Sequence, residues 1–383
     1  MSEPPAVAGG FQVKSKKAKG KNESRFRNFY FLLLPFHLAQ ITRPLPQTVL
    51  TCMKKFKTIL AVLLCFVCFQ TARADWVKQN LNTLAWLHDV YFLNENSGWI
   101  AGSNGTLFAT ADGGKTWKKE KTATEDNIRQ VYFSDEFTGW LLCERNIFNR
   151  GANASSYILK TTNGGIDWEK QEFEEIKRER IVKLFFNSEK QGFAIGESGA
   201  FYALRETEEK WKRLISPVKY LLLDGTFTDA KTGIIVGASG SIFFTEDSGA
   251  TWKPSSIFGQ PKAKFNSVFF LDPKNGWTVG TEGKIFQTGN GGRTWREQPS
   301  GVNANLNDIV FTSSTKGWAI GDEGTVLFTN SAGSKWILKE SKIKHKFEKI
   351  FFNGKKGWIV GFGGTVLVYD SETSQIQKPT LKK

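Results

Sequence analysis

Residues 87–117, LHDVYFLNENSGWIAGSNGTLFATADGGKTW, contain three short apolar segments and the start of a fourth, separated by turn residues. Alternation of apolar and polar residues within such segments is typical of strands that bury one face. The chain repeats this stretch with variation up to about residue 370. We therefore predict an all-β protein built from units of four strands.

A glycine followed by a large apolar residue marks the repeat and recurs seven times, at intervals of 40 to 53 residues. The seven glycines are Gly98, Gly139, Gly192, Gly233, Gly276, Gly317 and Gly357. A second turn, Gly-x-x-Gly, follows in every repeat but the second, where the insertion 144–156 accounts for the longest interval. Seven repeats of four strands predict a seven-bladed β-propeller.

The third strand of the first repeat is followed by the turn Thr110-x-Asp112-x-Gly114-x-Thr116-Trp117. The turn recurs at 161–168, 245–252 and 288–295, and in degenerate form before Trp211 and Trp336. An Asp or Asn in such a turn can accept hydrogen bonds from the backbone around it. We assign this structural role to Asp112, Asn163, Asp247 and Asn290. The pattern resembles the Asp-box turn of β-propellers.

The N-terminal part of the repeat region predicts how the ring closes. Trp76 precedes Leu87 by 11 residues, as Trp117 precedes Ile128. The last repeat ends near Asp370 without a fourth strand of its own. We therefore expect the N-terminal strand near Trp76 to complete the last blade of a propeller spanning 75–370, which removes the free sheet edges.

Residues 53–74 have the organisation of a secretory signal peptide, with three lysines, an apolar run at 59–69 and Ala72-Arg73-Ala74 at the end. We expect cleavage after Ala74 and export to the periplasm or a thylakoid-lumen-like compartment. Residues 1–52 carry no repeat. We interpret them as an over-extended, disordered N-terminus, with translation starting at Met53, or as part of a two-part targeting leader. The polar tail 371–383 is expected to be disordered.

The net charge of +15 is unevenly distributed, since residues 1–74 hold 12 Lys and Arg but two acidic residues. The repeats are only mildly basic, so we expect no nucleic-acid partner. Of the four cysteines only Cys143 follows the leader, which leaves no intrachain disulfide. We expect a monomer.

The segments that join one repeat to the next vary in length and are rich in charge, and binding residues concentrate in such loops on rigid scaffolds. The candidates are Arg178, Arg180, Lys219, Lys264 and Lys344. They would form a basic rim for an acidic protein segment. Acidic residues interleaved at 172–179 make a solvated face the alternative.

Two further binding candidates stand apart from these loops. The insertion 144–156 carries Arg145 and Arg150, and a hairpin tip without a ligand is its alternative. Trp86 is the one tryptophan of 13 that the repeat pattern leaves unassigned. It precedes an innermost strand near the channel mouth, where it could anchor a peptide or pack under a loop.

Catalysis finds little support in the residue pattern. After the leader the sequence contains two histidines, His88 and His345, in different repeats, and no Ser-His-Asp set, metal cluster or phosphate loop. Acidic residues of the second turns could meet at the channel as a carboxylate pair, although acids in turns more often serve solubility. These are Glu197, Glu282, Asp322 and Glu323. We expect no enzymatic activity, no cofactor and no metal.

Together, the seven repeats with Gly-Trp, Gly-x-x-Gly-Thr and Asp-Gly-Gly-x-Thr-Trp resemble the photosystem II assembly/stability factor family over about residues 75–370. The resemblance implies a propeller on the lumenal or periplasmic side that binds newly made integral membrane subunits, or their exported loops, without catalysis. It also implies a basic patch, carried over to Arg178 and Arg180. Peripheral membrane association stays open.

The alternative function is an Asp-box glycan hydrolase or a carbohydrate-binding propeller. A sialidase of this kind would have six blades and an Arg-Ile-Pro motif, whereas this sequence has seven repeats and no such motif. A lectin would carry several equivalent aromatic and acidic pockets. The second turns of the repeats differ too much from one another to suggest that.

Overall fold

A computed structural model describes residues 76–145, 155–175, 179–188, 190–205, 208–259 and 262–370. The chain divides into two compact units, Met1–Gln70 and Thr71–Lys383, and every described residue belongs to the second. The predicted segments 1–52, 53–74 and 371–383 lie outside the described residues, as do Arg150 and Arg178. Within the described part, no helix is long and apolar enough to cross a membrane.

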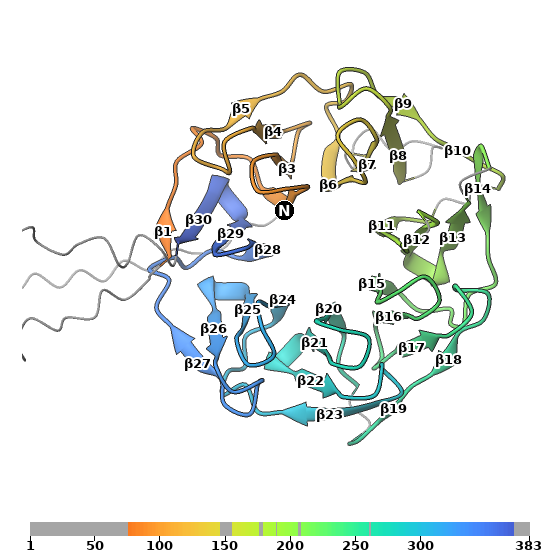
Figure 1. The fold of residues 1–383 in the computed structure, drawn as a ribbon, viewed down its shortest axis with the longest axis vertical. Coiled ribbons are helices and arrows are strands. Elements are labelled where there is room, and N and C mark those ends of the chain that lie inside the picture. The colour runs from red at the N-terminus through yellow and green to blue at the C-terminus, as the bar shows by residue number, and fades with distance from the viewer. Residues whose placement is uncertain are drawn as a thin grey trace, which may run out of the picture. The chain divides into compact units, whose positions relative to one another are not determined.

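Seven sheets surround a central channel, as Figure 1 shows, and we number them as blades 1 to 7. Blade 1 contains β2 (Leu87–Phe92), β3 (Gly98–Gly102), β4 (Leu107–Thr110) and β5 (Lys118–Lys119). Blade 2 contains β6 (Asn127–Phe133), β7 (Gly139–Glu144), β8 (Ser156–Thr161) and β9 (Glu169–Lys170). Blade 3 contains β11 (Ile181–Phe186), β12 (Gly192–Gly196), β13 (Phe201–Leu204) and β14 (Lys210–Arg213). Blade 4 contains β15 (Leu222–Phe227), β16 (Gly233–Gly237), β17 (Ile242–Thr245) and β18 (Lys253–Pro254).

Blade 5 contains β20 (Phe265–Phe270), β21 (Gly276–Gly280), β22 (Ile285–Thr288) and β23 (Thr294–Gln298). Blade 6 contains β24 (Leu306–Phe311), β25 (Gly317–Gly321), β26 (Val326–Thr329) and β27 (Ile337–Lys339). Blade 7 contains β28 (Phe347–Asn353), β29 (Lys356–Gly361), β30 (Thr365–Asp370) and the N-terminal β1 (Val77–Lys78). Between the second and third strands lie the single 3-10 turns η2 (Glu197–Gly199), η3 (Thr281–Gly283), η4 (Asp322–Gly324) and η5 (Phe362–Gly364). The predicted seven-bladed propeller of four-stranded blades is thus confirmed.

Two blades carry an additional strand that the sequence did not predict. β10 (Glu172–Phe173) pairs in parallel with β14 at the edge of blade 3, and β19 (Ser256–Ile257) does so with β23 in blade 5. In each case the strand comes from the linker that follows the preceding blade. These linkers therefore cover the outer edges of the two blades.

The N-terminal strand closes the ring as predicted. In β1, Val77 lies opposite Val368 and Lys78 opposite Leu367 of β30. The ring of Trp76 packs edge-on against that of Trp318 in blade 6, with 5.5 Å between centroids. The first described residues thus join the last blade to its neighbour.

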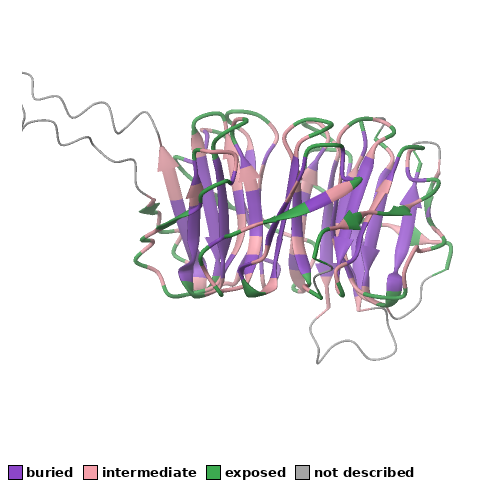
Figure 2. Cartoon of the chain, turned by 90° about the horizontal axis from the view of Figure 1, so that it is seen from below, coloured by how far each residue is buried: buried purple, intermediate pink, exposed green. Residues whose placement is uncertain are grey.

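The core lies between the blades, where the apolar faces of adjacent sheets meet. In Figure 2 most strand residues are buried, and exposed residues gather in the loops at the two ends. The Trp of the Gly-Trp motif stacks on a Phe of the next blade. The ring centroids are 3.9 Å apart for Trp99 and Phe133. The glycine of the motif is needed because a Cβ at Gly98 would lie 2.4 Å from the Phe92 ring. The repeat signature therefore encodes contacts between and within blades.

Backbone hydrogen bonds divide the loops between two faces of the ring. The turn between the second and third strands contacts the linker to the next blade, since the N–H of Gly105 donates to the carbonyl of Asp126 at 2.7 Å. The Asp-box turn contacts the loop between the first and second strands, since the N–H of Gly113 donates to the carbonyl of Asn96 at 2.9 Å. We call the face that carries the second turns and the linkers the mouth face. The opposite face, which carries the Asp-box turns, is the Asp-box face.

Candidate functional site at the channel mouth

A β-bulge near the start of each innermost strand shapes the channel. In β2 the register with β3 shifts between Leu87 and Asp89, and the other six innermost strands shift at the equivalent place. A bulge sets two residues opposite one on the partner strand. His88 and Asp89 therefore both line the channel, while Leu87 and Val90 are buried in the core.

Sevenfold repetition turns this local feature into rings of side chains. We call the residues at the bulge the bulge ring: His88, Arg129, Val182, Leu223, Asn266, Asn307 and Glu348. The residues that follow form the channel belt: Asp89, Gln130, Lys183, Asp224, Ser267, Asp308 and Lys349. In each innermost strand, one buried apolar residue precedes the bulge. The residues directly before these buried residues form the mouth ring: Trp86, Asn127, Arg180, Leu221, Lys264, Asn305 and Lys346. All of the bulge ring and belt, and four mouth-ring residues, line one pocket of about 310 Å³.

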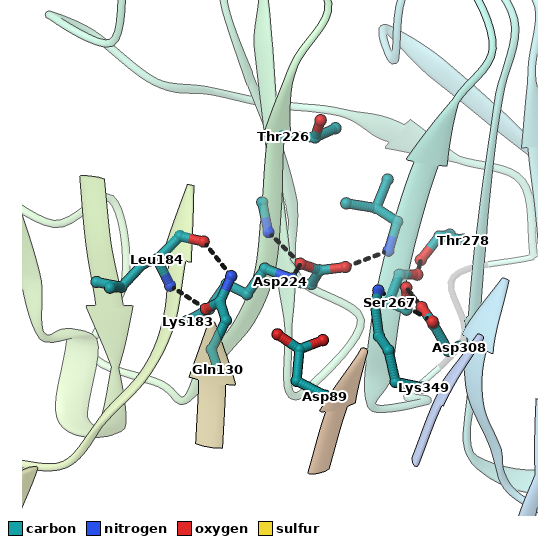
Figure 3. A network of polar contacts seen from close by, with 12 residues as sticks. Asp89, Gln130, Lys183, Leu184, Asp224, Thr226, Ser267, Thr278, Asp308 and Lys349 are labelled. Atoms are coloured by element: carbon teal, nitrogen blue, oxygen red, sulfur yellow. Dashed lines mark hydrogen bonds and ion pairs between the residues drawn. The ribbon is translucent and has the colours of Figure 1, made fainter. Parts of the chain in front are cut away.

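The acidic and amide side chains of the channel belt connect adjacent blades (Figure 3). The carboxylate of Asp89 accepts the N–H of Val131 at 2.9 Å, and Asp308 accepts that of Ile350 at 2.9 Å. Asp224 accepts the N–H of Val268 in the same way. Gln130 bonds both the N–H and the carbonyl of Leu184. Each bond satisfies a buried backbone group of the next blade, so the belt links adjacent blades by hydrogen bonds.

The belt also carries buried charges that are partly compensated. Lys183 Nζ lies 3.0 Å from Asp224, and Lys349 Nζ lies 3.0 Å from Asp308. Burial raises the pKa of Asp89, although nearby Lys349 and Lys183 oppose that shift. Burial alone would lower the pKa of Lys349, but the carboxylates of Asp308, Asp89 and Asp224 raise it. Lys349 therefore stays charged, which keeps the belt polar and dependent on pairing.

The arginines at the mouth of blades 2 and 3 are engaged within the protein. Arg129 Nε lies 3.2 Å from Glu144, and Arg180 lies 3.4 Å from Glu144 and 3.0 Å from Glu197. Arg129 Nη1 also approaches the His88 ring nitrogens at 3.2 and 3.3 Å. Burial, with Arg129 and Lys346 nearby, lowers the pKa of His88 from 6.5 to about 2. His88 is therefore neutral, and one of its ring nitrogens can accept a hydrogen bond from the Arg129 guanidinium.

The structure separates the predicted binding residues into two groups. Arg180 is ion-paired, and Arg145 packs over the Tyr157 ring at 4.6 Å and lies 4.0 Å from Asp126. By contrast, Lys219, Lys264 and Lys344 are exposed and form no ion pair with a described residue. All three lie in linkers of the mouth face, and Lys264 lines the channel pocket. These lysines thus contribute exposed positive charge at the mouth.

The acidic residues of the second turns do not form a carboxylate pair among the described contacts. Glu197 pairs with Arg180, and Asp322 accepts hydrogen bonds from Asn305 and Asn307 at 3.0 and 2.9 Å. The carboxylates that face the channel come instead from the belt, which the sequence reasoning missed. A signal was present, since a polar residue at the belt position follows the bulge in all seven repeats.

On the opposite face, the Asp-box side chains hold their turns together. Asp112 accepts the N–H and hydroxyl of Thr116 at 2.9 and 2.6 Å and the hydroxyl of Thr110 at 2.8 Å. These bonds, chiefly from Thr116, lower the pKa of Asp112 to about 2. Asn163, Asp247 and Asn290 accept the equivalent backbone N–H. The four side chains are thus occupied by their own turns.

Comparison with known proteins adds to this geometry. The family model described as photosynthesis system II assembly factor YCF48 matches residues 69–149, 203–301 and 295–378. A photosystem II assembly lipoprotein Ycf48 from Trichormus variabilis is 36% identical over 78 residues, which cover 19% of this chain and 23% of that relative. The match thus spans about a quarter of the curated relative's length.

Two solved structures share the fold. A YCF48 bound to a D1 peptide has a TM-score of 0.63 and 22% identity, covering 79% of this chain and 99% of its own. YCF48 from Cyanidioschyzon merolae has a TM-score of 0.64 and 19% identity, covering 78% and 99%. At this identity the likeness concerns the fold, whereas the family match extends over most of the described propeller. The chain belongs to the photosynthesis system II assembly factor YCF48 family.

Proposed function

We propose that this protein is an exported, non-catalytic scaffold that binds a segment of a photosystem II subunit during assembly. Family membership supports this role. A solved relative of the same fold is bound to a D1 peptide, which makes a protein ligand the natural candidate here. The proposed ligand is an exported, acidic segment of an integral membrane subunit.

The arc of unpaired lysines on the mouth face is the observation that carries the proposal. Lys219, Lys264 and Lys344 are exposed and lie on three different linkers of a rigid ring. Cations that lack an internal partner can pair with carboxylates of a ligand at little rearrangement cost. Arg180 could join them only by sharing its bonds with Glu144 and Glu197. We therefore place the centre of the binding surface at the lysines, with Arg180 at its border.

Export is part of the same proposal. The signal-peptide pattern at 53–74 and the name lipoprotein given to the Trichormus relative both favour a protein that leaves the cytoplasm. We place the propeller in the periplasm or a thylakoid-lumen-like compartment, as a monomer with at most peripheral contact to the membrane. The segments of membrane subunits exposed on that side would be its ligands.

A scaffold role also suits the chemistry of the channel. The Asp89, Asp224 and Asp308 carboxylates each accept a backbone N–H from the next blade. An acid that is committed to such a bond is poorly placed to exchange protons with a substrate. Within the described residues, no three His, Cys, Asp or Glu side chains lie close enough to hold a metal ion.

The proposal is tested by co-purification from the membrane fraction of the native host. The tagged full chain is compared with a triple variant, Lys219→Glu, Lys264→Glu and Lys344→Glu. A matched control reverses three exposed lysines of the Asp-box face, Lys115, Lys231 and Lys274. We expect photosystem II subunits with the wild type and the control but not with the mouth-face variant. Equal recovery with all three proteins would contradict the site, and retention on glycans alone would contradict the function.

A further inference from the structure

The mouth ring and the second turns are not uniform, and each carries one large aromatic residue where blades 7 and 1 meet. In the second turn, the residue after the first glycine is Ser103, Glu197, Ala238, Thr281 or Asp322 in five blades but Phe362 in blade 7. In the mouth ring, six blades carry Asn, Arg, Leu or Lys, whereas blade 1 carries Trp86. Two large aromatic residues thus occupy adjacent blades at positions where the repeat does not require them.

The two rings meet at the surface. The centroids of Trp86 and Phe362 are 5.5 Å apart in an edge-on arrangement, and the exposed His345 packs on Phe362 at 5.8 Å. Phe362 remains 47% exposed, and Trp86 is half-buried. We call Trp86, Phe362 and His345 the aromatic platform. The contact between Trp86 and Phe362 joins blades 1 and 7, but it leaves Phe362 exposed to solvent. An exposed aromatic surface of this kind can mark a binding site.

Positive charge borders the platform. Lys346 Nζ lies 5.6 Å from the centre of the Trp86 ring and orients that ring by a cation–π contact. Its other partner is Glu348, at 3.1 Å. The exposed Lys344 is two residues away in the same linker and forms no ion pair with a described residue. A ligand that suits this place combines an apolar side chain with neighbouring carboxylates.

We infer that the aromatic platform selects the ligand by binding one aromatic or large aliphatic side chain within the acidic segment. This inference rests on the proposed function and specifies its ligand. The lysine arc would attract any acidic segment, whereas the platform would accept only those with an apolar residue next to their acids. Burying such a residue in a partly preformed aromatic site is typical of interface hot spots.

The test is a double-mutant cycle measured by fluorescence anisotropy with the full chain. The probes are a labelled peptide of four glutamates around one phenylalanine and the same peptide with alanine in its place. The protein variant is Phe362→Ser, which introduces the residue that blade 1 carries at this position. Phe137→Ser removes an aromatic that is 64% exposed on the Asp-box face and is the matched control.

We expect the wild type and the Phe137→Ser variant to bind the phenylalanine peptide about tenfold more tightly than the alanine peptide. The Phe362→Ser variant should bind both peptides with the affinity that the wild type has for the alanine peptide. Salt-sensitive binding of both peptides without discrimination would overturn the platform but keep the proposed function, whereas no binding of either would overturn both. If Phe362→Ser lost binding to phosphatidylglycerol vesicles or lost self-association, with unchanged peptide discrimination, the platform would belong to a lipid surface or a second copy.

Discussion

The ammonium group of Lys349 lies 3.0 Å from the carboxylate of Asp308, although the two residues belong to the innermost strands of different blades. The same carboxylate accepts the N–H of Ile350 and, on its other oxygen, the hydroxyl of Ser267. One acidic side chain thus contacts the blades on both sides of its own. The channel of this propeller is therefore held by a polar belt as well as by the apolar contacts between sheets.

Removing Lys349 should leave the Asp308 charge buried with too little compensation. We expect Lys349→Met to lower the free energy of unfolding by about 3 kcal/mol in urea titrations. Adding Asp308→Asn should recover part of the loss, because the amide oxygen can still accept the Ile350 N–H. Lys118→Met in an exposed pair is the control and should change stability by less than about 1 kcal/mol. If Lys349→Met and Lys118→Met lowered the free energy of unfolding equally, the belt would not have the stabilising role proposed for it.

The neutral state of His88 predicts an acid-sensitive stability. Its pKa is lowered from 6.5 to about 2 in the folded protein, so below pH 6.5 the unfolded chain binds a proton that the folded chain does not. His88 therefore contributes stability at neutral pH that is lost as the pH falls, by about 1.4 kcal/mol per pH unit. Between pH 7.5 and 5.0, His88→Asn should lose about 2 kcal/mol less than the wild type. His345→Asn is the control, and an equal loss in all three proteins would refute the assignment.

Closure of the ring by β1 predicts a stability role for Trp76. Its ring packs against Trp318 and, at 5.9 Å, against Phe352. Trp76→Ala should cost about 3 kcal/mol of unfolding free energy, because it opens a cavity at the seam. Val77→Ala at the neighbouring position should have little effect, since Val77 is 65% exposed. A Trp76→Ala protein as stable as the wild type would show that the seam is held by other contacts.

The Asp-box turn predicts a difference between two substitutions at one position. Asp112→Ala removes the acceptor for the Thr116 N–H and should lower the melting temperature. Asp112→Asn should melt close to the wild type, because Asn163 and Asn290 make the same backbone bond in other blades. Neither change should alter ligand binding on the opposite face. Weaker ligand binding by a folded Asp112→Ala protein would contradict a purely structural role.

The sequence predicted the blades well because their signature residues take part in repeated contacts. Gly98 must be small to admit Phe92, and the motif tryptophans must reach the next blade, so both recur at fixed spacing. The parallel strands β10 and β19 could not be predicted, since two-residue pairings in variable linkers leave no periodic pattern.

The candidate site was only partly predictable for a related reason. A bulge breaks the alternation of the innermost strands, so His88 and Asp89 both reach the channel where a period of two would place only one of them. Charge counting identified Arg180 and Lys264 alike, but only the structure shows that Arg180 is paired with Glu144 and Glu197. Pairing depends on residues that lie far apart in sequence, which a single chain does not reveal.

The most direct test of the central claim is a titration of the full chain with a D1 peptide, the ligand named for the solved relative. Affinity is measured by calorimetry at low and at physiological salt, for the wild type and the two triple lysine variants described above. We predict salt-sensitive binding that is retained by the Asp-box-face variant and weakened at least tenfold by Lys219→Glu, Lys264→Glu and Lys344→Glu. Equal affinity in all three proteins, or no binding by the wild type, would contradict the claim.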